Sequence, residues 1–437
     1  MTGKGRAWDR AGVLDAILAP VILPRMAVIR QRFADTGIRD VPAAVARELG
    51  RPEVRATLRP GMSVAITAGS RGIANIVSIL RAVVQAVKDA GGRPFIVSAM
   101  GSHGGGTDEG QRLLLEGYGI TEPAVGAPIR SSMETVVVGT TEDGFPVHLD
   151  RIAAGADGII VVGRIKPHTA FRAEYEGGLV KMMAIGLGKQ KGAEICHAAG
   201  FGRFDRMLPS FARVVLSTGR ILFGVGIVED FRDETSRIEA VLPAQIFRRE
   251  AELLEESRRL MPGIPFPEFD VLVVDEIGKN FSGDGADPNI TGTYCTPYAS
   301  GGPRIKRYVV LDVHPESKGN SLGVGMADIT TARLLEKTDF DAMYPNALTS
   351  RALNTVRIPM VMRNDRLALQ AAVFTSIGAD LKRPRIVRIR NTSRVETLMI
   401  SEAMMDEARA LPQVDVIAQP RELEFDENGD LKTGDLK

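Results

Sequence analysis

Cysteine is scarce in this sequence, and long apolar runs are missing altogether. Among its 437 residues there are only two cysteines, Cys196 and Cys295, and they lie far apart in the sequence. Two such residues cannot make a disulfide framework, and their scarcity is typical of a reducing compartment. No stretch approaches the roughly eighteen uninterrupted apolar residues of a membrane-spanning helix. The sequence therefore excludes a disulfide-stabilised secreted domain and predicts no membrane span.

An excess of either charge is also missing. The chain has 55 lysines and arginines against 54 aspartates and glutamates, so it shows no electrostatic footprint for nucleic acid or an anionic membrane. The first residues, MTGKGRAWDRAGVLDAIL, include acids and lack the apolar core of a signal peptide. We expect a cytoplasmic protein with neither nucleic acid nor membrane as a partner.

Common ligand motifs are absent as well. The sequence has no GxxxxGK[ST] phosphate loop, no HExxH and no CxxC pair for zinc or iron–sulfur. The glycines of GSHGGGTDEG do not match GxGxxG, so a nicotinamide-binding Rossmann enzyme has little support.

The order of apolar runs and glycine-rich turns indicates an α/β protein. A length of 437 residues favours at least two domains, and MPGIPFPEF, with three prolines, is the clearest linker. We predict an N-terminal α/β domain over 1–262 that carries the site and a C-terminal α/β domain over 263–412. The segment 413–437 is expected to pack back on the first domain. The active site is expected in the cleft between the domains.

Two local predictions accompany this division. Residues 1–50 are expected to be mainly helical. Residues 243–261 are expected to form a charged helix whose acids and arginines, Glu250 among them, make a solvated face.

The segment Asp157–Gly200 has the features of a reaction centre. An apolar run, Ile159–Val162, predicts a buried strand, and His168 follows it closely. Lys181 lies in an otherwise apolar run, where burial easily lowers the pKa of an amine. His197 closes the segment beside Cys196.

Histidine is rare, and its placement is informative. The chain has five histidines, and His103 and His168 each follow an apolar run that predicts a strand. Open α/β sheets bind their ligands at the carboxyl ends of strands. A similar loop, AGSRGIAN, stands between a predicted strand at 63–67 and a helix at about 76–90, where Arg71 can hold a phosphate or carboxylate.

These elements resemble the lactate racemase family that uses a nickel-pincer nucleotide. The resemblance lies in SRG (70–72), MGSHGGG (100–106), KPH (166–168) with GGLVK (177–181), and the later His197. It implies that Lys181 is covalently joined to pyridinium-3-thioamide-5-thiocarboxylate mononucleotide and that His197 ligates its nickel. His103 and His168 are then the acid and base, and cofactor-synthesis proteins are expected partners.

The resemblance also implies contacts from the first loop and the second domain. Ser70 and Arg71 are expected at the cofactor, and Arg71 and Lys279 are expected to bind the substrate carboxylate. The family's first loop often has an acid and then Thr-Arg-Pro, whereas Ala68–Gly72 lacks both the acid and the proline. This departure suggests a 2-hydroxy acid other than lactate.

The implied function is racemisation or epimerisation at C2 of a 2-hydroxy acid, an isomerase reaction. A carboxylate makes C2 a poor carbon acid, so transient hydride removal to the cofactor is easier than proton removal. Histidine, with a pKa near about 6.5, suits the exchange of the hydroxyl proton. Two alternatives remain open. One is a zinc hydrolase that uses His103, His168 and His197, and the other is a non-enzymatic protein that binds a small ligand.

Overall fold

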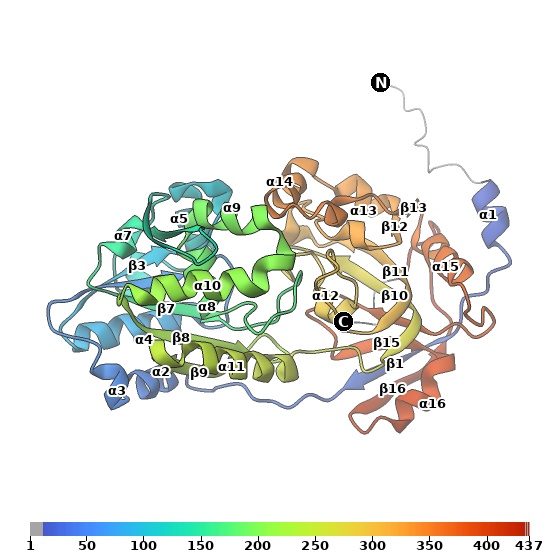
Figure 1. Cartoon of the computed structure of the whole chain (residues 1–437). Helices are drawn as coiled ribbons and strands as arrows, with labels where there is room; N and C mark the ends of the chain where they lie inside the picture. Colours follow the sequence, from blue (N-terminus) through green and yellow to red (C-terminus); the bar gives the residue numbers. More distant parts are fainter. Residues whose placement is uncertain (1–11, 433, 435, 437) are drawn as a thin grey trace. The chain divides into compact units, whose positions relative to one another are not determined.

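The computed structural model describes residues 12–432, 434 and 436. The chain divides into two compact units, and each contains a mixed α/β arrangement (Figure 1). Unit 2 is Asp35–Met261, and unit 1 joins the chain up to Ala34 with the chain from Pro262 onward. The predicted α/β fold class is therefore confirmed. None of the helices in the described ranges has both the length and the apolar character of a membrane span.

Unit 2 contains a six-stranded sheet of order β4-β3-β2-β7-β8-β9. Its first five strands in this order are parallel neighbours, and β9 pairs with β8 antiparallel. The strand bounds are Ser63–Ala68 (β2), Arg93–Ser98 (β3), Ile129–Arg130 (β4), Gly158–Arg164 (β7), Ile221–Glu229 (β8) and Thr235–Val241 (β9), and a separate hairpin pairs Thr135–Thr140 (β5) with Pro146–Asp150 (β6).

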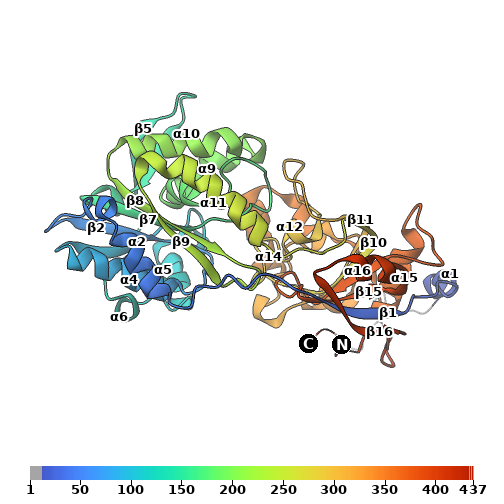
Figure 2. The same cartoon turned by 90° about the horizontal axis from the view of Figure 1, so that it is seen from below.

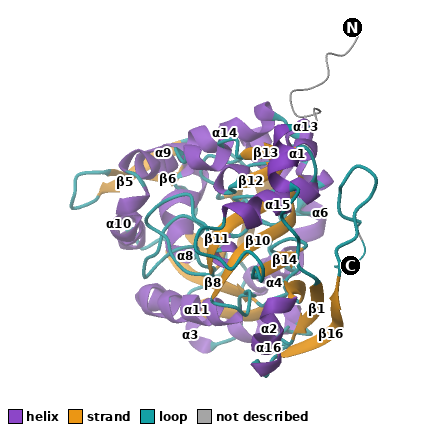
Figure 3. Cartoon of the chain, turned by 90° about the vertical axis from the view of Figure 1, so that its right-hand side faces the viewer, coloured by secondary structure: helices purple, strands orange, loops and turns teal. Residues whose placement is uncertain are grey.

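The helices of unit 2 cover both faces of this sheet because its strands are apolar on both sides. Along β7, Ile159 and Val161 point into one core cluster, and Ile160 and Val162 point into another. This alternation is the two-residue period of a strand, and apolar residues at every position are typical of a buried parallel strand. Figure 3 distinguishes the strands from the flanking helices.

The helical segments of unit 2 are Val41–Leu49 (α2), Pro52–Arg55 (α3), Ile76–Asp89 (α4), Gly104–Gly106 (η1), Asp108–Gly117 (α5), Glu122–Val125 (α6), Arg151–Ala154 (α7), Leu179–Lys181 (α8), Met182–Gly186 (η2, a π-helix), Lys189–Ala199 (α9), Phe201–Arg203 (η3), Phe204–Ser217 (α10), Pro243–Gln245 (η4) and Ile246–Leu260 (α11).

Unit 1 contains an eight-stranded sheet of order β13-β12-β11-β10-β14-β15-β1-β16. The pairs from β13 to β14 are parallel, and the remaining pairs are antiparallel. Its strands are Met26–Gln31 (β1), Glu268–Ile277 (β10), Arg304–Val313 (β11), Ile329–Thr331 (β12), Met360–Met362 (β13), Ile386–Ile389 (β14), Thr397–Ser401 (β15) and Val414–Arg421 (β16).

The helical segments of unit 1 are Val13–Leu18 (α1), Pro288–Thr291 (α12), Pro315–Ser317 (η5), Val324–Met326 (η6), Ala332–Lys337 (α13), Phe340–Ser350 (α14), Leu353–Val356 (η7), Asp365–Thr375 (α15), Glu402–Met404 (η8) and Met405–Ala410 (α16).

The predicted domain bounds are wrong at both ends of the chain. The N-terminal strand β1 pairs with β15 and β16, so the chain before Asp35 belongs to unit 1 (Figure 2). The segment after residue 413 likewise adds β16 to this sheet and belongs to unit 1. Residues 1–50 are also not mainly helical, because MAVIRQ forms β1 between two helices; the part before Gly12 lies outside the described residues. The division of the chain into two units therefore depends on strand pairs between residues that are far apart in the sequence.

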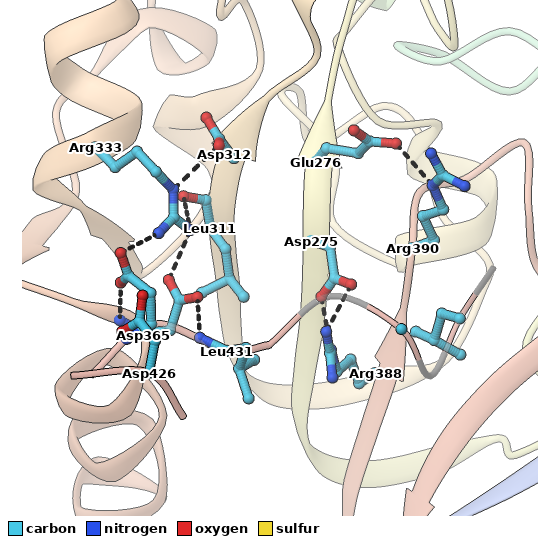
Figure 4. A pocket seen from close by; sticks show the side chains of 13 residues that line it. Asp275, Glu276, Leu311, Asp312, Arg333, Asp365, Arg388, Arg390, Asp426 and Leu431 are labelled. Carbon is cyan, nitrogen blue, oxygen red and sulfur yellow. Dashed lines mark hydrogen bonds and ion pairs between the residues drawn. The ribbon is translucent and has the colours of Figure 1, made fainter. Parts of the chain in front are cut away.

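A polar pocket of about 580 Å³ lies in unit 1, near the carboxyl ends of β10 and β11 (Figure 4). Its charges compensate one another: Arg388 pairs with Asp275, and Arg390 pairs with Glu276. Arg333 pairs with three acids, including the buried Asp365. The segment after β16 contributes Asp430, whose carboxylate accepts a bond of 3.2 Å from the backbone N–H of Asp365. These pairs attach the C-terminal segment to unit 1.

Arg333→Met tests this attachment. The change leaves the buried Asp365 without its cation, and we expect a loss of about 3–5 kcal/mol in the free energy of unfolding, measured in urea. Arg304→Met is the matched control, because its ion pair with Glu268 is exposed (81% and 56% of the side chains). That control should cost less than about 1 kcal/mol. Equal losses in the two variants would contradict a structural role for Arg333.

Candidate active site

Three loops of unit 2 carry the residues that the sequence singled out. Ser70 and Arg71 follow β2, His103 follows β3, and His168 follows β7. These strands are adjacent and parallel in the order β3-β2-β7, so their carboxyl ends lie at one edge of the sheet. The structure therefore brings the three predicted loops to the same edge.

The His168 loop is held by a buried carboxylate that the sequence reasoning missed. Glu176 is 1% exposed and accepts a hydrogen bond of 2.6 Å from the backbone N–H of His168. Its other oxygen accepts bonds from the backbone of Ala173, at 3.0 Å, and from Arg258, at 2.6 Å. Arg172 donates to the carbonyl of His168 at 2.6 Å. Multiple charge-assisted bonds to one buried acid give this loop a single conformation.

Burial and positive neighbours set the protonation of His168. Burial lowers its pKa well below the ordinary value, and the nearby Lys181, His197, Arg71 and Arg172 lower it further. The ring is therefore neutral near pH 7. Three other predicted site residues, Arg71, Lys181 and His197, therefore lie close enough to His168 to act on its imidazole.

The two proposed acid/base histidines are in opposite tautomers. Nδ1 of His168 lies 3.1 Å from the backbone N–H of Ala170 and accepts from it, so the proton of the neutral ring is on Nε2. Nδ1 of His103 lies 2.8 Å from the carbonyl of Met100, which can only accept, so this ring carries its proton on Nδ1. Nε2 of His103 can accordingly accept a proton, whereas Nε2 of His168 can donate a hydrogen bond.

The segment that carries Lys181 is an irregular helix. Helix α8 continues directly into the π-helix η2, and π-helical turns occur frequently at functional sites. The Lys181 side chain is half-buried. This segment packs on the His103 loop, because the backbone N–H of Gly101 donates to the carbonyl of Gly186 at 3.3 Å. A Cβ on Gly186 would lie 2.9 Å from the carbonyl oxygen of Ala99, so the close approach requires glycine.

A second buried acid, Glu250 of α11, lies at the start of this helix. Its Oε2 accepts from the backbone N–H of Val180 at 2.8 Å, and burial raises its pKa to about 8. The prediction that Glu250 belongs to a solvated face is wrong, because its side chain is fully buried. The signal was present in the sequence: Glu250 lies four residues from both Ile246 and Leu254, on the apolar face of the helix.

His197 lies in α9 against aromatic side chains. Its ring centroid is 5.5 Å from that of Phe201 and 5.4 Å from that of Phe204. The neighbouring Cys196 is buried, and burial raises the pKa of its thiol to about 12, so it is protonated in the metal-free protein. A neutral imidazole, in contrast, can ligate a metal without losing a proton.

The remaining predicted residue belongs to the other unit. Lys279 follows β10 of unit 1, and its amine donates to the carbonyl of Gly283 at 2.6 Å. Its role in substrate binding stays a prediction. Within the described residues, no group of three or more His, Cys, Asp and Glu could hold a metal ion. The three histidines therefore do not form the protein-only zinc centre that a hydrolase would need.

Comparison with known proteins places the site in a family context. Residues 24–204 match the family described as "Lactate racemase N-terminal domain". This stretch contains Ser70, Arg71, His103, His168, Lys181 and His197. No curated protein sequence matches the chain. Among solved structures, the chain is similar to the lactate racemase apoprotein from Thermoanaerobacterium thermosaccharolyticum, with 13% identity, 77% of this chain and 88% of that chain covered, and a TM-score of 0.45.

Glu250→Gln should change how stability depends on pH. The folded pKa of about 8 lies above the value of about 4.3 of an unfolded glutamate, so between these values the unfolded state binds fewer protons. The free energy of unfolding of the wild type therefore falls as the pH rises, by at most about 1.4 kcal/mol per pH unit. Glutamine removes this contribution.

Urea unfolding at pH 5, 6, 7 and 8 measures the effect. The stability of Glu250→Gln relative to wild type should rise steadily over this range. The exposed Glu252 of the same helix gives a control, Glu252→Gln, whose relative stability should not change with pH between 5 and 8. A pH-independent difference for Glu250→Gln would show that this carboxyl group ionises normally.

Proposed function

We propose that the chain, whose residues 24–204 match the lactate racemase N-terminal domain, is a member of the lactate racemase family and inverts C2 of a 2-hydroxy acid. The observation that carries the proposal is the pair of opposite histidine tautomers at one edge of the sheet. Racemisation or epimerisation at C2 needs a group that accepts the hydroxyl proton and a group that donates to the same oxygen. His103 and His168 offer one of each.

His103 is the proton acceptor of this pair. Its Nδ1–H is engaged by the carbonyl of Met100, so Nε2 carries the lone pair of the neutral ring. A proton taken there makes an imidazolium whose Nδ1–H bond to that carbonyl becomes stronger. Loss of the hydroxyl proton, and of the C2 hydrogen as a hydride, leaves a 2-keto acid. Return of the hydride to the opposite face of C2 and of a proton to the oxygen gives the other enantiomer, so atoms and electrons balance.

His168 supports the same chemistry from a neutral ring. Its lowered pKa keeps it from competing for the proton, and its Nε2–H can donate to the substrate oxygen. The surrounding positive charge suits an anionic substrate. Arg71 remains the proposed fork for the carboxylate, since a guanidinium can hold it by two parallel bonds.

The residues present fit a tethered nickel cofactor. Imidazole is a suitable nickel donor, and His197 offers one where the adjacent thiol stays protonated. Lys181 is half-buried in the segment that packs on the His103 loop, and its amine is the group that attachment would use. We propose that Lys181 holds the nickel-pincer nucleotide, with Ser70 and Arg71 on its nucleotide part, and that His197 binds its nickel. The chemistry that the cofactor would supply when bound is acceptance of a hydride.

Substitution of the three histidines tests these roles. His103→Ala and His168→Ala should lower the racemisation rate by about a hundredfold or more, the usual scale for acid–base catalysis, and should keep nickel. His197→Ala should lose nickel as well as activity. Protein from a host that makes the cofactor is assayed for nickel content, intact mass and racemisation of several 2-hydroxy acids.

Two further variants complete the comparison. Lys181→Ala should lose the covalent mass adduct, whereas His148→Ala, whose ring bonds to Thr135 in the separate hairpin, should keep adduct, nickel and activity. Equal loss of metal in the His103, His168 and His197 variants would favour a three-histidine metal centre. Full activity of the His103 and His168 variants with nickel bound would contradict the proposed acid–base pair.

A further inference from the structure

A fully buried lysine lies next to the His103 loop, and the proposed chemistry does not use it. Lys189 is 0% exposed. Its ammonium makes three hydrogen bonds: 2.7 Å to the carbonyl of Ser98, 2.9 Å to the hydroxyl of Ser98 and 2.6 Å to the side-chain oxygen of Gln111. An ammonium has three donors, so all of them are used.

The charge of Lys189 is compensated by a buried acid. A carboxylate oxygen of Asp150, itself 0% exposed, lies 3.7 Å from the ammonium. The backbone N–H of Asp150 donates to the carbonyl of Leu187 at 2.7 Å, so the acid is attached to the chain just before Lys189. Burial lowers the pKa of Lys189 to about 8, and Asp150 opposes this shift. A buried ion pair of this kind is weak evidence for stability, which raises the question of its function.

The backbone at Lys189 is unusual as well. Its φ is 54°, a left-handed conformation that residues other than glycine rarely adopt. Backbone strain of this kind persists where the surrounding structure demands it, and it clusters at functional sites. Glycine would adopt this conformation without strain. The presence of lysine at this position is therefore explained by the contacts of its side chain.

Gln111 connects Lys189 to the His103 loop. Its side-chain nitrogen donates to the carbonyl of Gly101 at 2.9 Å and to that of His103 at 3.1 Å. An amide side chain can be placed in either of two orientations, and its partners decide between them. Because Lys189 can only donate, it requires the oxygen of Gln111 to face it. The two N–H groups of Gln111 must then face the two loop carbonyls.

We propose that Lys189 is a positioning residue that acts through Gln111 to hold the His103 loop, and with it the Nδ1–H tautomer of His103. The proposal deepens the proposed function and rests on it for its catalytic meaning. Gly101, Gly104, Gly105 and Gly106 all have positive φ, so the loop around His103 has a backbone of high intrinsic freedom. The bonds from Gln111 restrict that freedom at Gly101 and at His103 itself.

Lys189→Met tests the proposal, because methionine keeps the length of the side-chain stem and removes all three donors. Histidine labelled with ¹⁵N in the full-length protein without cofactor reports the tautomer of each ring. The His103 signals are assigned with a His103→Gln variant. In the wild type, His103 should show protonation of Nδ1 alone. In Lys189→Met it should lose this single pattern and show exchange between both tautomers.

Gln111→Leu should likewise abolish the single tautomer of His103. This variant tests the proposal if Lys189→Met fails to fold. Val83→Ala, a buried change in α4 of the same unit, is the control for general destabilisation and should leave the His103 signals unchanged. In cofactor-loaded protein, Lys189→Met should also reduce kcat by about a hundredfold, the scale of a small misplacement.

An unchanged His103 tautomer in Lys189→Met and Gln111→Leu would overturn the proposal, and so would an equal change in Val83→Ala. The spectra need neither cofactor nor substrate. Failure of the chain to racemise any 2-hydroxy acid would therefore contradict the proposed function without affecting the result for Lys189.

Discussion

The site of unit 2 depends on one constraint: each charged side chain that is buried beside this edge of the parallel sheet needs a partner. Glu176, Glu250 and Lys189 are each at least 99% buried, and each hydrogen-bonds to a segment that carries a proposed catalytic or cofactor-binding residue. A buried charge without a partner destabilises the folded state. Removal of one member of a buried pair leaves the other without compensation. The His168 loop, the helix that carries Lys181 and the His103 loop are thereby held by interactions that tolerate few alternatives.

Each buried group has a different effect on its neighbour. Glu176, as a carboxylate, satisfies the backbone of the His168 loop and the guanidinium of Arg258. Glu250, with a pKa of about 8, is mainly a neutral acid at the start of the helix that carries Lys181.

Much of the fold could be predicted from local patterns. The apolar runs before His103 and His168 gave strands at the expected places, because buried parallel strands carry apolar residues at every position. The division of the chain could not be predicted in this way. MAVIRQ has no local feature that indicates its partners, which lie almost 400 residues later in the sequence, and only long-range pairing assigns it to unit 1.

The site residues likewise separate into those that local sequence patterns could predict and those that depend on contacts made by the fold. Histidine is rare in this chain and indicated His103 and His168 after strands and His197 further along, and an amine in an apolar run indicated Lys181. The supporting groups were missed because glutamate, glutamine and lysine are common and usually exposed. Glu250 on an apolar helix face was the one signal in the sequence. Lys189 and Gln111 meet only through the fold, 78 residues apart, and no periodicity indicates their contact.

Retention of the C2 hydrogen tests the central claim most directly. A single enantiomer of a 2-hydroxy acid that the loaded enzyme accepts, labelled with deuterium at C2, is converted in ordinary water, and the product is analysed by mass spectrometry and chiral separation. Hydride removal and return predict that the inverted product keeps its deuterium. Loss of deuterium to water in step with inversion would show that C2 is deprotonated instead, and it would contradict the proposed chemistry.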